Sequence, residues 1–348
     1  MAAVLFITQR PYRVVGHSME PALADGDWLV LGRSDPRAGD LVVLREPDSG
    51  GLAVKRVAAT PGENVQIIGS DLWVDGGLRA RDLAGVEDLV PMLDVFGAAI
   101  GNEFDFPQGG FAERDGGWLL ASGAAQVYLK RPPLAGYLLR GIPVPGALPA
   151  ADLGLEVAYA LPAPGSALLL HLRLGRALFT AVLDDSGRAA RILRREPEGA
   201  ESVLAEVALD PPAPRGLLFF SIADRRLTLS AGARRLVSGL RFEPPEPRTF
   251  ADGPADLGLR AHAGIGGVGP LEISRVRLGR DVLYDASGTF GGGSGFHLGP
   301  DEFFVLGDNP PFSRDSRHYG AVQRDRIVGV VRRRLWPGGW TERGWSRD

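Results

Sequence analysis

Short apolar runs separated by turn-forming residues set the pattern of the first part of the chain. The runs in residues 10–76 are Arg13–Val15, Trp28–Leu31, Leu41–Leu44, Ala53–Val57 and Leu72–Val74. Glycine, proline and aspartate stand between them, at Asp25–Asp27, Pro36–Asp40, Asp48–Gly51 and Pro61–Gly62. Strands of this length with turns at this spacing are typical of an antiparallel β-barrel or sandwich.

The pattern changes in residues 84–296 and returns after them. The middle stretch carries further strand-like runs at Ala167–Leu172, Leu217–Ile222, Arg226–Leu229 and Leu271–Val276, between loops rich in proline and glycine. It ends in Gly291–Gly295, a flexible linker by composition. Tight strand-and-turn sequence then resumes at Glu302–Leu306 and Ile327–Val331.

A length of 348 residues is more than one compact domain usually holds. We therefore predict a mainly β protein of two domains. The first domain comprises residues 1–83 and 297–348, and residues 84–296 form a second, β-sandwich-like domain inserted between its halves.

Charge and composition exclude several functions. The formal net charge is −3, which offers no broad basic surface for nucleic acid. The chain has no cysteine, and its histidines lack the paired spacing of metal ligands, so we expect no metal site. The histidines are His17, His171, His262, His297 and His318. Gly264–Gly269 spells G-x-G-x-x-G, but Pro270 and a strand-like run follow instead of a helix, so we expect a glycine-rich loop between strands and no dinucleotide cofactor.

No stretch approaches the roughly 20 apolar residues needed to cross a bilayer. The run Met1–Ile7 is too short for a span and lacks the charged leader and cleavage site of a secretory signal. We interpret it either as the end of a longer anchor or as part of a protein that associates with a membrane through surface apolar residues.

The first candidate for chemistry is Ser18, at the end of an apolar run. Gly16 before it lets the backbone approach a substrate closely, and Pro21 after it fixes the exit of the chain. Taken alone, a serine in such a turn is ordinarily structural.

The second candidate is Lys55. Side chains alternate along a strand, so Lys55 shares a face with Ala53 and Val57, whereas Arg56 points to the opposite face. Small and apolar neighbours desolvate the amine and lower its pKa, because desolvation disfavours the charged form. The alternative is a surface lysine whose amine reaches water.

The third candidate segment is Phe304–Arg317. It combines turn formers, hydroxyls and an Asp/Arg pair, which suffice to anchor a loop by local hydrogen bonds. In an extended backbone Ser313, Asp315 and Arg317 face the same way. That spacing sets a hydroxyl beside the lysine amine, with an ion pair behind it.

Together these segments resemble bacterial signal peptidase I. In order they contain S-M-x-P, G-D-L-V-V-L, V-K-R-V-A-A-T-P-G-E, L-G-D-N-x-x-x-S-x-D-S-R-x-x-G and I-V-G-x-x-x-x-x-W-P. The resemblance covers residues 12–76 and 302–337 and omits the middle, which is longer than the family's usual β-rich insertion. Each motif is ordinary, whereas their order is specific.

The resemblance implies a serine endopeptidase with an antiparallel β catalytic domain. Ser18 would attack the peptide bond to form an acyl-enzyme, and Lys55 would be the neutral amine that takes its proton. A base useful near neutral pH needs a pKa of roughly 7 to 8, against ~10.4 for a free lysine, so burial is essential. The Ser18 backbone N–H would bind the oxyanion, but Gly16 stands where some relatives have a second, hydroxyl donor.

The supporting residues implied by the resemblance surround this pair. Ser313 would orient the Lys55 amine, and Met19 would pack beside the site. Arg56 matches the family's Lys-Arg pair and is expected to be structural. The residues that would stabilise the loop holding Ser313 are Asp308, Asn309, Asp315 and Arg317.

The implied substrates are exported preproteins, cut after signal peptides with small residues one and three positions before the bond. The implied location is the cell membrane, with the catalytic domain outside the cytoplasm. Two alternatives stay open: a self-cleaving peptidase of the LexA type, and an inactive scaffold. The middle domain, with Trp118, Phe219, Phe220 and Tyr284, resembles concanavalin-like sandwiches, which implies a carbohydrate or envelope ligand; a structural spacer is the alternative.

Overall fold

The computed structural model describes residues 11–335 apart from 69, 84, 106–109, 115, 132, 141, 151, 176, 197–198, 244–262, 285–287 and 294. The run Met1–Ile7, His262 and the W-P pair at 336–337 therefore lie outside the described residues. The chain divides into two compact units. Unit 1 comprises Met1–Arg79, Tyr137–Val144 and Val282–Asp348, and unit 2 comprises Ala80–Gly136 and Pro145–Asp281.

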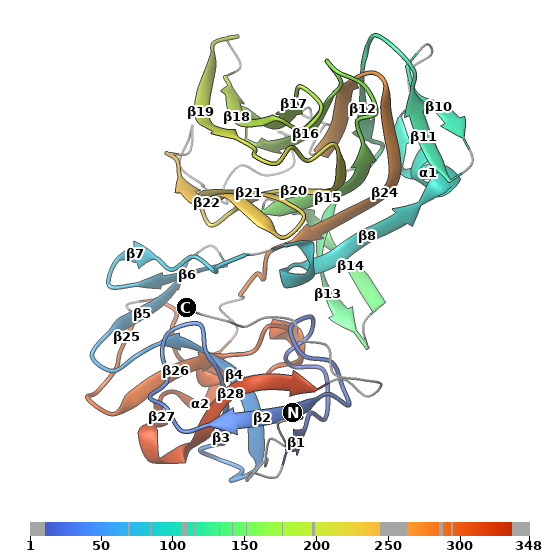
Figure 1. Cartoon of the computed structure of the whole chain (residues 1–348). Helices are drawn as coiled ribbons and strands as arrows, with labels where there is room; N and C mark the ends of the chain where they lie inside the picture. Colours follow the sequence, from blue (N-terminus) through green and yellow to red (C-terminus); the bar gives the residue numbers. More distant parts are fainter. Residues whose placement is uncertain are drawn as a thin grey trace, which may run out of the picture. The chain divides into compact units, whose positions relative to one another are not determined.

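The main sheet of unit 1 combines strands from both ends of the chain (Figure 1). Its order is β1 (Tyr12–Arg13), β2 (Trp28–Gly32), β28 (Ile327–Leu335), β3 (Leu41–Arg45), β4 (Leu52–Ala59), β26 (Glu302–Leu306) and β27 (Val322–Gln323). All its pairings are antiparallel. The late strand β28 therefore lies between the two early strands β2 and β3.

Smaller elements complete unit 1. A second sheet has the order β25 (Phe296–His297), β5 (Asn64–Ile68), β6 (Asp71–Val74) and β7 (Gly77–Leu78). Short helices follow β26: η4 (Pro310–Phe312), α2 (Ser316–Tyr319) and η5 (Arg324–Arg326). A two-stranded sheet of β13 (Leu134–Leu139) and β14 (Ile142–Pro149) comes from the middle of the chain, and its residues Tyr137–Val144 cluster with unit 1.

Unit 2 is built from two larger sheets. The first has the order β10 (Ala112–Arg114), β11 (Gly117–Leu120), β24 (Leu271–Arg280), β15 (Leu153–Ala160), β20 (Arg215–Ala223), β21 (Arg226–Ala231) and β22 (Arg234–Arg241), and β8 (Val90–Phe96) also pairs with β24. The second has the order β19 (Glu201–Ala208), β18 (Ala189–Arg195), β17 (Ala177–Asp184), β16 (Ala167–Leu174), β23 (Ala263–Val268), β12 (Ala124–Leu129) and β9 (Phe104–Asp105). The short helices η1 (Val86–Asp88), η2 (Gly97–Ala99) and α1 (Ile100–Glu103) connect strands.

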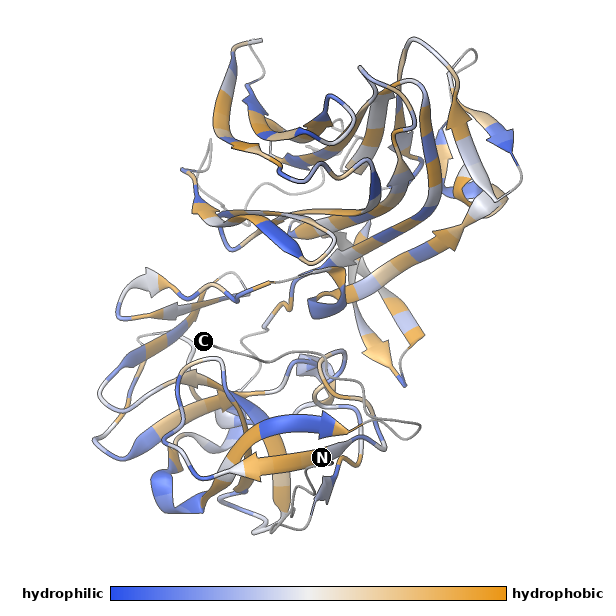
Figure 2. Cartoon of the chain, viewed as in Figure 1, coloured by the Kyte–Doolittle hydropathy of each residue, from blue (hydrophilic) through white to orange (hydrophobic). Residues whose placement is uncertain are grey.

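Alternating side chains explain why these segments form layered sheets. Figure 2 shows hydrophobic and hydrophilic bands alternating along β8 and β24, as expected for strands with one buried face. In unit 2, Leu155 and Val157 of β15 and Leu168 and Leu170 of β16 belong to one buried cluster that joins both sheets. Unit 2 is therefore a β-sandwich, and the protein is mainly β.

Three sequence expectations need correction. Gly291–Gly295 is more than a flexible linker, because Ile67 N donates to Gly291 O (2.7 Å) and Gln66 Nε2 donates to Gly293 O (3.1 Å). The G-x-G-x-x-G segment forms most of β23 rather than a loop. The middle stretch does not cluster as one body, since Tyr137–Val144 and the residues from Val282 onward cluster with unit 1.

None of the helices that the structure describes is long and apolar enough to cross a membrane.

Candidate active site

Ser18 lies in the turn that joins β1 to β2. Gly16, two residues earlier, has φ = +92°, a left-handed conformation that favours glycine. Its N–H donates to Asp25 Oδ1 (2.9 Å), which ties the two ends of the turn together. Met19 is buried in the cluster with Val14, where it holds the turn against the sheet. These contacts leave the Ser18 side chain partly exposed.

Lys55 lies in the middle of β4, opposite Val42 of β3. Val42 and Val57 belong to one apolar cluster, with Ala53 packed against it. Lys55 is only 3% exposed, and its Nζ lies 3.1 Å from Ser18 Oγ and 3.1 Å from Val54 O. The fold thus brings an amine to within hydrogen-bonding distance of a hydroxyl 37 positions earlier in the sequence.

Burial lowers the pKa of Lys55 below its ordinary value, because the protein interior disfavours the ammonium form. The carboxylates of Asp315, Glu46 and Asp308 oppose this effect, and the Arg317 guanidinium adds to it. The net direction is downward. A neutral amine beside a hydroxyl can accept its proton, which is the arrangement that activates a serine nucleophile.

Arg56, the next residue of β4, anchors the loop after β26. Its Nε donates to Asp308 Oδ1 (2.8 Å), its Nη2 donates to Asp308 Oδ2 (2.5 Å), and its Nη1 donates to Gly39 O (2.9 Å). The Asp308 side chain is fully buried. This fork-shaped ion pair fixes the position of the loop relative to the strand that carries Lys55.

A second ion pair closes the same loop. Arg317 Nε and Nη2 donate to Asp315 Oδ1 (2.9 Å) and Oδ2 (3.0 Å), and Asp315 Oδ2 also accepts from Gly307 N (3.0 Å). Arg317 Nη2 further donates to Pro310 O (3.0 Å). The sequence predicted one extended run through Arg317, but Asp315 is the N-cap of α2, so Arg317 lies within a helix.

Asn309 connects the loop to the serine turn. Its backbone N–H donates to Ser18 O (3.0 Å), and its Nδ2 donates to His17 O (2.9 Å) and to Leu138 O (2.8 Å). Both hydrogens of the side-chain amide are therefore used. Asn309 fixes the backbone on either side of the bond between His17 and Ser18.

Ser313 lies near the backbone of Ser18 but forms no hydrogen bond with Ser18 or Lys55. Its side chain is 6% exposed, and within the described part of the chain its Oγ has no hydrogen-bond partner. A Cβ built on Gly307 would lie 2.2 Å from Ser313 Oγ and 2.7 Å from Ser18 O, so glycine at 307 leaves room for both. The predicted hydrogen bond from Ser313 to the Lys55 amine is absent from this structure, and its orienting role stays a prediction.

The backbone of Ser18 offers one donor to a substrate. Among the residues that the structure describes, no group accepts a hydrogen bond from Ser18 N. A free N–H at the nucleophile is what an oxyanion site requires. Gly16 supplies no side-chain donor beside it.

Sequence reasoning missed the contribution of β13, which it assigned to the middle domain. Leu138 supplies a carbonyl to Asn309, and the Tyr137 ring meets the Phe312 ring edge-on at 5.4 Å. It also missed a bond from His17 Nδ1 to Glu20 Oε1 (2.9 Å) within the serine turn. The spacing of His17 and Glu20 was visible in the sequence, whereas nothing in it pointed to Leu138.

Comparison with known sequences agrees with this geometry. Residues 1–85 and 282–336 match the family described as signal peptidase, peptidase S26. Signal peptidase I of Streptococcus pneumoniae is 39% identical over 64 residues, which are 18% of this chain and 31% of that protein. Signal peptidase IB of Staphylococcus aureus is 50% identical over 36 residues, 10% of this chain and 19% of that protein. The chain thus spans about a third or less of the length of these relatives.

Solved structures show distant likeness to β-sandwiches. A carbohydrate-binding module from Bacillus subtilis superposes with a TM-score of 0.31 and 13% identity, covering 51% of this chain and 92% of that one. A galectin from Caenorhabditis elegans gives a TM-score of 0.27 and 9% identity, covering 38% of this chain and 84% of that one.

The family match covers the two segments that supply Ser18, Lys55 and the loop from Asp308 to Arg317. The middle of the chain lies outside it. The chain is thus similar to signal peptidases over the two segments that form the candidate site.

Proposed function

We propose that the protein is a serine endopeptidase that removes signal peptides from exported preproteins. Ser18 is the nucleophile and Lys55 its general base. The observation that carries the proposal is the 3.1 Å separation of Lys55 Nζ and Ser18 Oγ, with the amine buried among apolar side chains. The signal peptidases to which the chain is similar suggest the substrate class.

The proposed reaction runs in two steps. The neutral Lys55 amine takes the Ser18 proton as Oγ attacks the carbonyl carbon, and the Ser18 N–H stabilises the oxyanion. Collapse of the tetrahedral intermediate forms the ester to Ser18, and the Lys55 ammonium gives its proton to the departing amine. Water, deprotonated by Lys55, then attacks the ester, and the Lys55 ammonium returns the proton to Ser18 Oγ as the signal peptide leaves.

The ion pairs Arg56–Asp308 and Asp315–Arg317 position the loop, Asn309 holds the serine turn, and Met19 packs under it. In this proposal Ser313 turns its free hydroxyl toward the Lys55 amine when substrate binds. The enzyme works at the cell membrane, with its catalytic unit outside the cytoplasm. The predicted carbohydrate or envelope ligand stays a prediction, and three of the aromatic residues that suggested it, Phe219, Phe220 and Tyr284, are buried.

A cleavage assay tests the proposal. The purified chain is incubated with a synthetic peptide that has small residues one and three positions before the expected bond, and mass spectrometry locates the cut. Ser18→Ala and Lys55→Met should each abolish cleavage.

The sequence contains only two lysines, so Lys130→Met is a matched control. Lys130 Nζ donates to Gly101 O in unit 2, and this variant should cut normally. Normal cleavage by Ser18→Ala or Lys55→Met would reject the dyad. A wild type that cuts no such peptide would favour an inactive scaffold, and cleavage of its own chain alone would favour a peptidase of the LexA type.

A further inference from the structure

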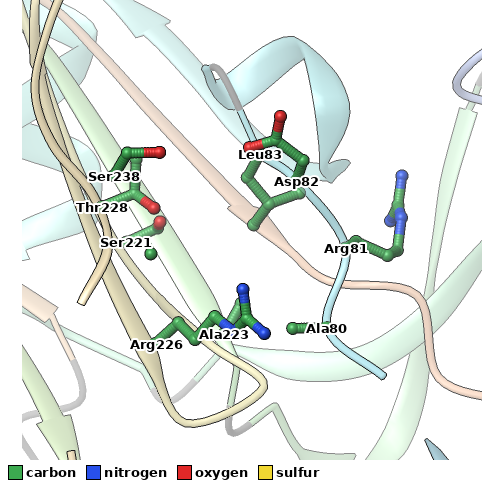
Figure 3. A pocket seen from close by; sticks show the side chains of 10 residues that line it. Ala80, Arg81, Asp82, Leu83, Ser221, Ala223, Arg226, Thr228 and Ser238 are labelled. Carbon is green, nitrogen blue, oxygen red and sulfur yellow. The ribbon is translucent and has the colours of Figure 1, made fainter. Parts of the chain in front are cut away.

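A small pocket lies within unit 2, whereas Ser18 and Lys55 belong to unit 1. It has a volume of about 120 Å³ and is bounded by β20, β21, β22 and the segment Ala80–Leu83. Figure 3 shows the hydroxyl-bearing side chains of Ser221, Thr228 and Ser238 along one wall. The peptidase proposed above makes no use of this pocket.

Two of the hydroxyls are buried and directly opposite each other. Ser221 of β20 pairs in register with Thr228 of β21, and their exposed fractions are 1% and 6%. Ser221 Oγ has no hydrogen-bond partner within the described part of the chain. A buried hydroxyl without a partner costs about 1–3 kcal/mol, so a bound molecule that accepts its hydrogen bond would be stabilised here.

The pocket also holds one positive charge that no carboxylate balances. Over the residues described, the Arg226 guanidinium has no hydrogen-bond or ion-pair partner. Asp82 is the acidic residue of the lining, and Arg235 Nη1 already donates to its carboxylate (2.9 Å). Arg81 is paired with Asp281 and points away from the hydroxyl wall in Figure 3.

The free donors of the pocket are therefore Arg226 and Ser221, and the carboxylate of Asp82 is already paired with Arg235. A guanidinium together with hydroxyl groups recognises the oxygen atoms of a phosphate, sulfate or carboxylate. None of the ten lining residues is aromatic, so the pocket lacks the stacking surface on which a sugar ring usually rests. We propose that this pocket binds a small oxyanion through Arg226, Ser221 and Thr228.

Calorimetry with the full chain tests this proposal, with inorganic phosphate, sulfate and acetate as probes at constant ionic strength. At least one probe should bind saturably and raise the melting temperature. The preferred probe distinguishes a tetrahedral from a carboxylate ligand. Arg226→Gln should weaken this binding at least tenfold, since it removes the charge-assisted hydrogen bonds.

Two further variants separate binding from folding. Ser221→Ala removes only the unpartnered hydroxyl, so it should not lower the melting temperature of the free protein but should reduce the increase produced by the anion. Arg215→Gln removes an exposed charge at the other end of β20 and should bind like the wild type. Absence of saturable binding, or equal binding by Arg226→Gln and Arg215→Gln, would overturn the proposal and leave a pocket that holds only water.

Discussion

In the proposed reaction Lys55 must meet two opposing demands, burial beside an apolar cluster and exchange of a proton with Ser18. Its pKa is lowered by burial, so the neutral amine is favoured in the folded protein relative to the unfolded chain. The unfolded chain consequently binds the extra proton between the folded pKa and 10.5. The stability contributed by the site therefore rises with pH across this window and stays constant, at its lowest value, below the folded pKa.

Activity should follow the same titration. Cleavage should increase with pH through the pKa of Lys55, with a midpoint below 10.5, because only the uncharged amine acts as base. The pKa can be measured separately in Lys130→Met, where ¹³C-labelled lysine gives a signal from Lys55 alone. Titration of that signal near 10.5, or a midpoint of activity that differs from it, would contradict the assignment.

Ser313 allows a sharper test at the residue scale. Its Oγ forms no hydrogen bond in the structure, so Ser313→Ala should leave the melting temperature nearly unchanged. If the hydroxyl orients the Lys55 amine in the substrate complex, kcat should fall by about tenfold to a hundredfold. In the presence of a peptide inhibitor, the pKa read from the Lys55 signal should also differ between Ser313→Ala and the protein with Ser313. Unchanged kcat would assign Ser313 a purely structural place.

The order of the sequence motifs predicted more of the candidate site than the chemistry of each single residue could. The order of the segments placed Ser18 and Lys55 together, and alternation along β4 correctly put Lys55 on the face with Ala53 and Val57. The sequence could not show that Ser313 lies without a bond, because a side-chain rotamer depends on the packing of neighbours such as Gly307.

The loop that follows β26 is anchored to β4 by the ion pair between Asp308 and Arg56. Replacing Arg56 with methionine removes the guanidinium that balances the buried Asp308 carboxylate, which should cost about 3–5 kcal/mol of stability. The double variant Arg56→Met with Asp308→Leu should recover much of that loss, since it removes both charges. Urea denaturation of the three proteins checks this; equal losses in the single and double variants would argue against the ion pair.

The strand β13 belongs to the middle stretch of the sequence, yet its residue Tyr137 contacts Phe312 of unit 1. Tyr137→Ala removes the edge-on contact with Phe312, worth about 0.5–1.5 kcal/mol, and loosens the helix η4 beside Ser313. We expect kcat/KM to fall severalfold. Tyr128→Ala in β12 of unit 2 is the matched control and should cleave normally. Equal activities of the two variants would show that β13 does not support the site.

The sequence predicted the positions of strands where the apolar runs were clear, but it did not predict which distant residues would contact one another. The predicted runs at Trp28–Leu31, Leu41–Leu44 and Glu302–Leu306 all lie within strands of the main sheet. The bond from Asn309 to Leu138 joins residues 171 positions apart, and no local pattern encodes such a contact. Glycine at 291 suggested flexibility by composition, whereas its carbonyl accepts a backbone hydrogen bond.

At the scale of the whole molecule, the chain passes between the two units more than once. It leaves unit 1 after Arg79, returns for Tyr137–Val144, and returns again at Val282. Replacing residues 80–281 by a short linker would therefore remove Leu138 and Tyr137 from the site as well as the sandwich. We expect the shortened protein to lose most of its activity, and full activity of that variant would show that unit 1 suffices.

The position of β28 determines when the main sheet can form during synthesis. β2 and β3 are made early, but each pairs with Ile327–Leu335 rather than with the other. A nascent chain that has emerged from the ribosome only as far as Arg326 keeps two unpaired edges, and their pairing must wait for a strand almost 300 positions later, a separation that slows folding. The proposed nucleophile and base are thus translated first, yet the sheet that supports them closes last.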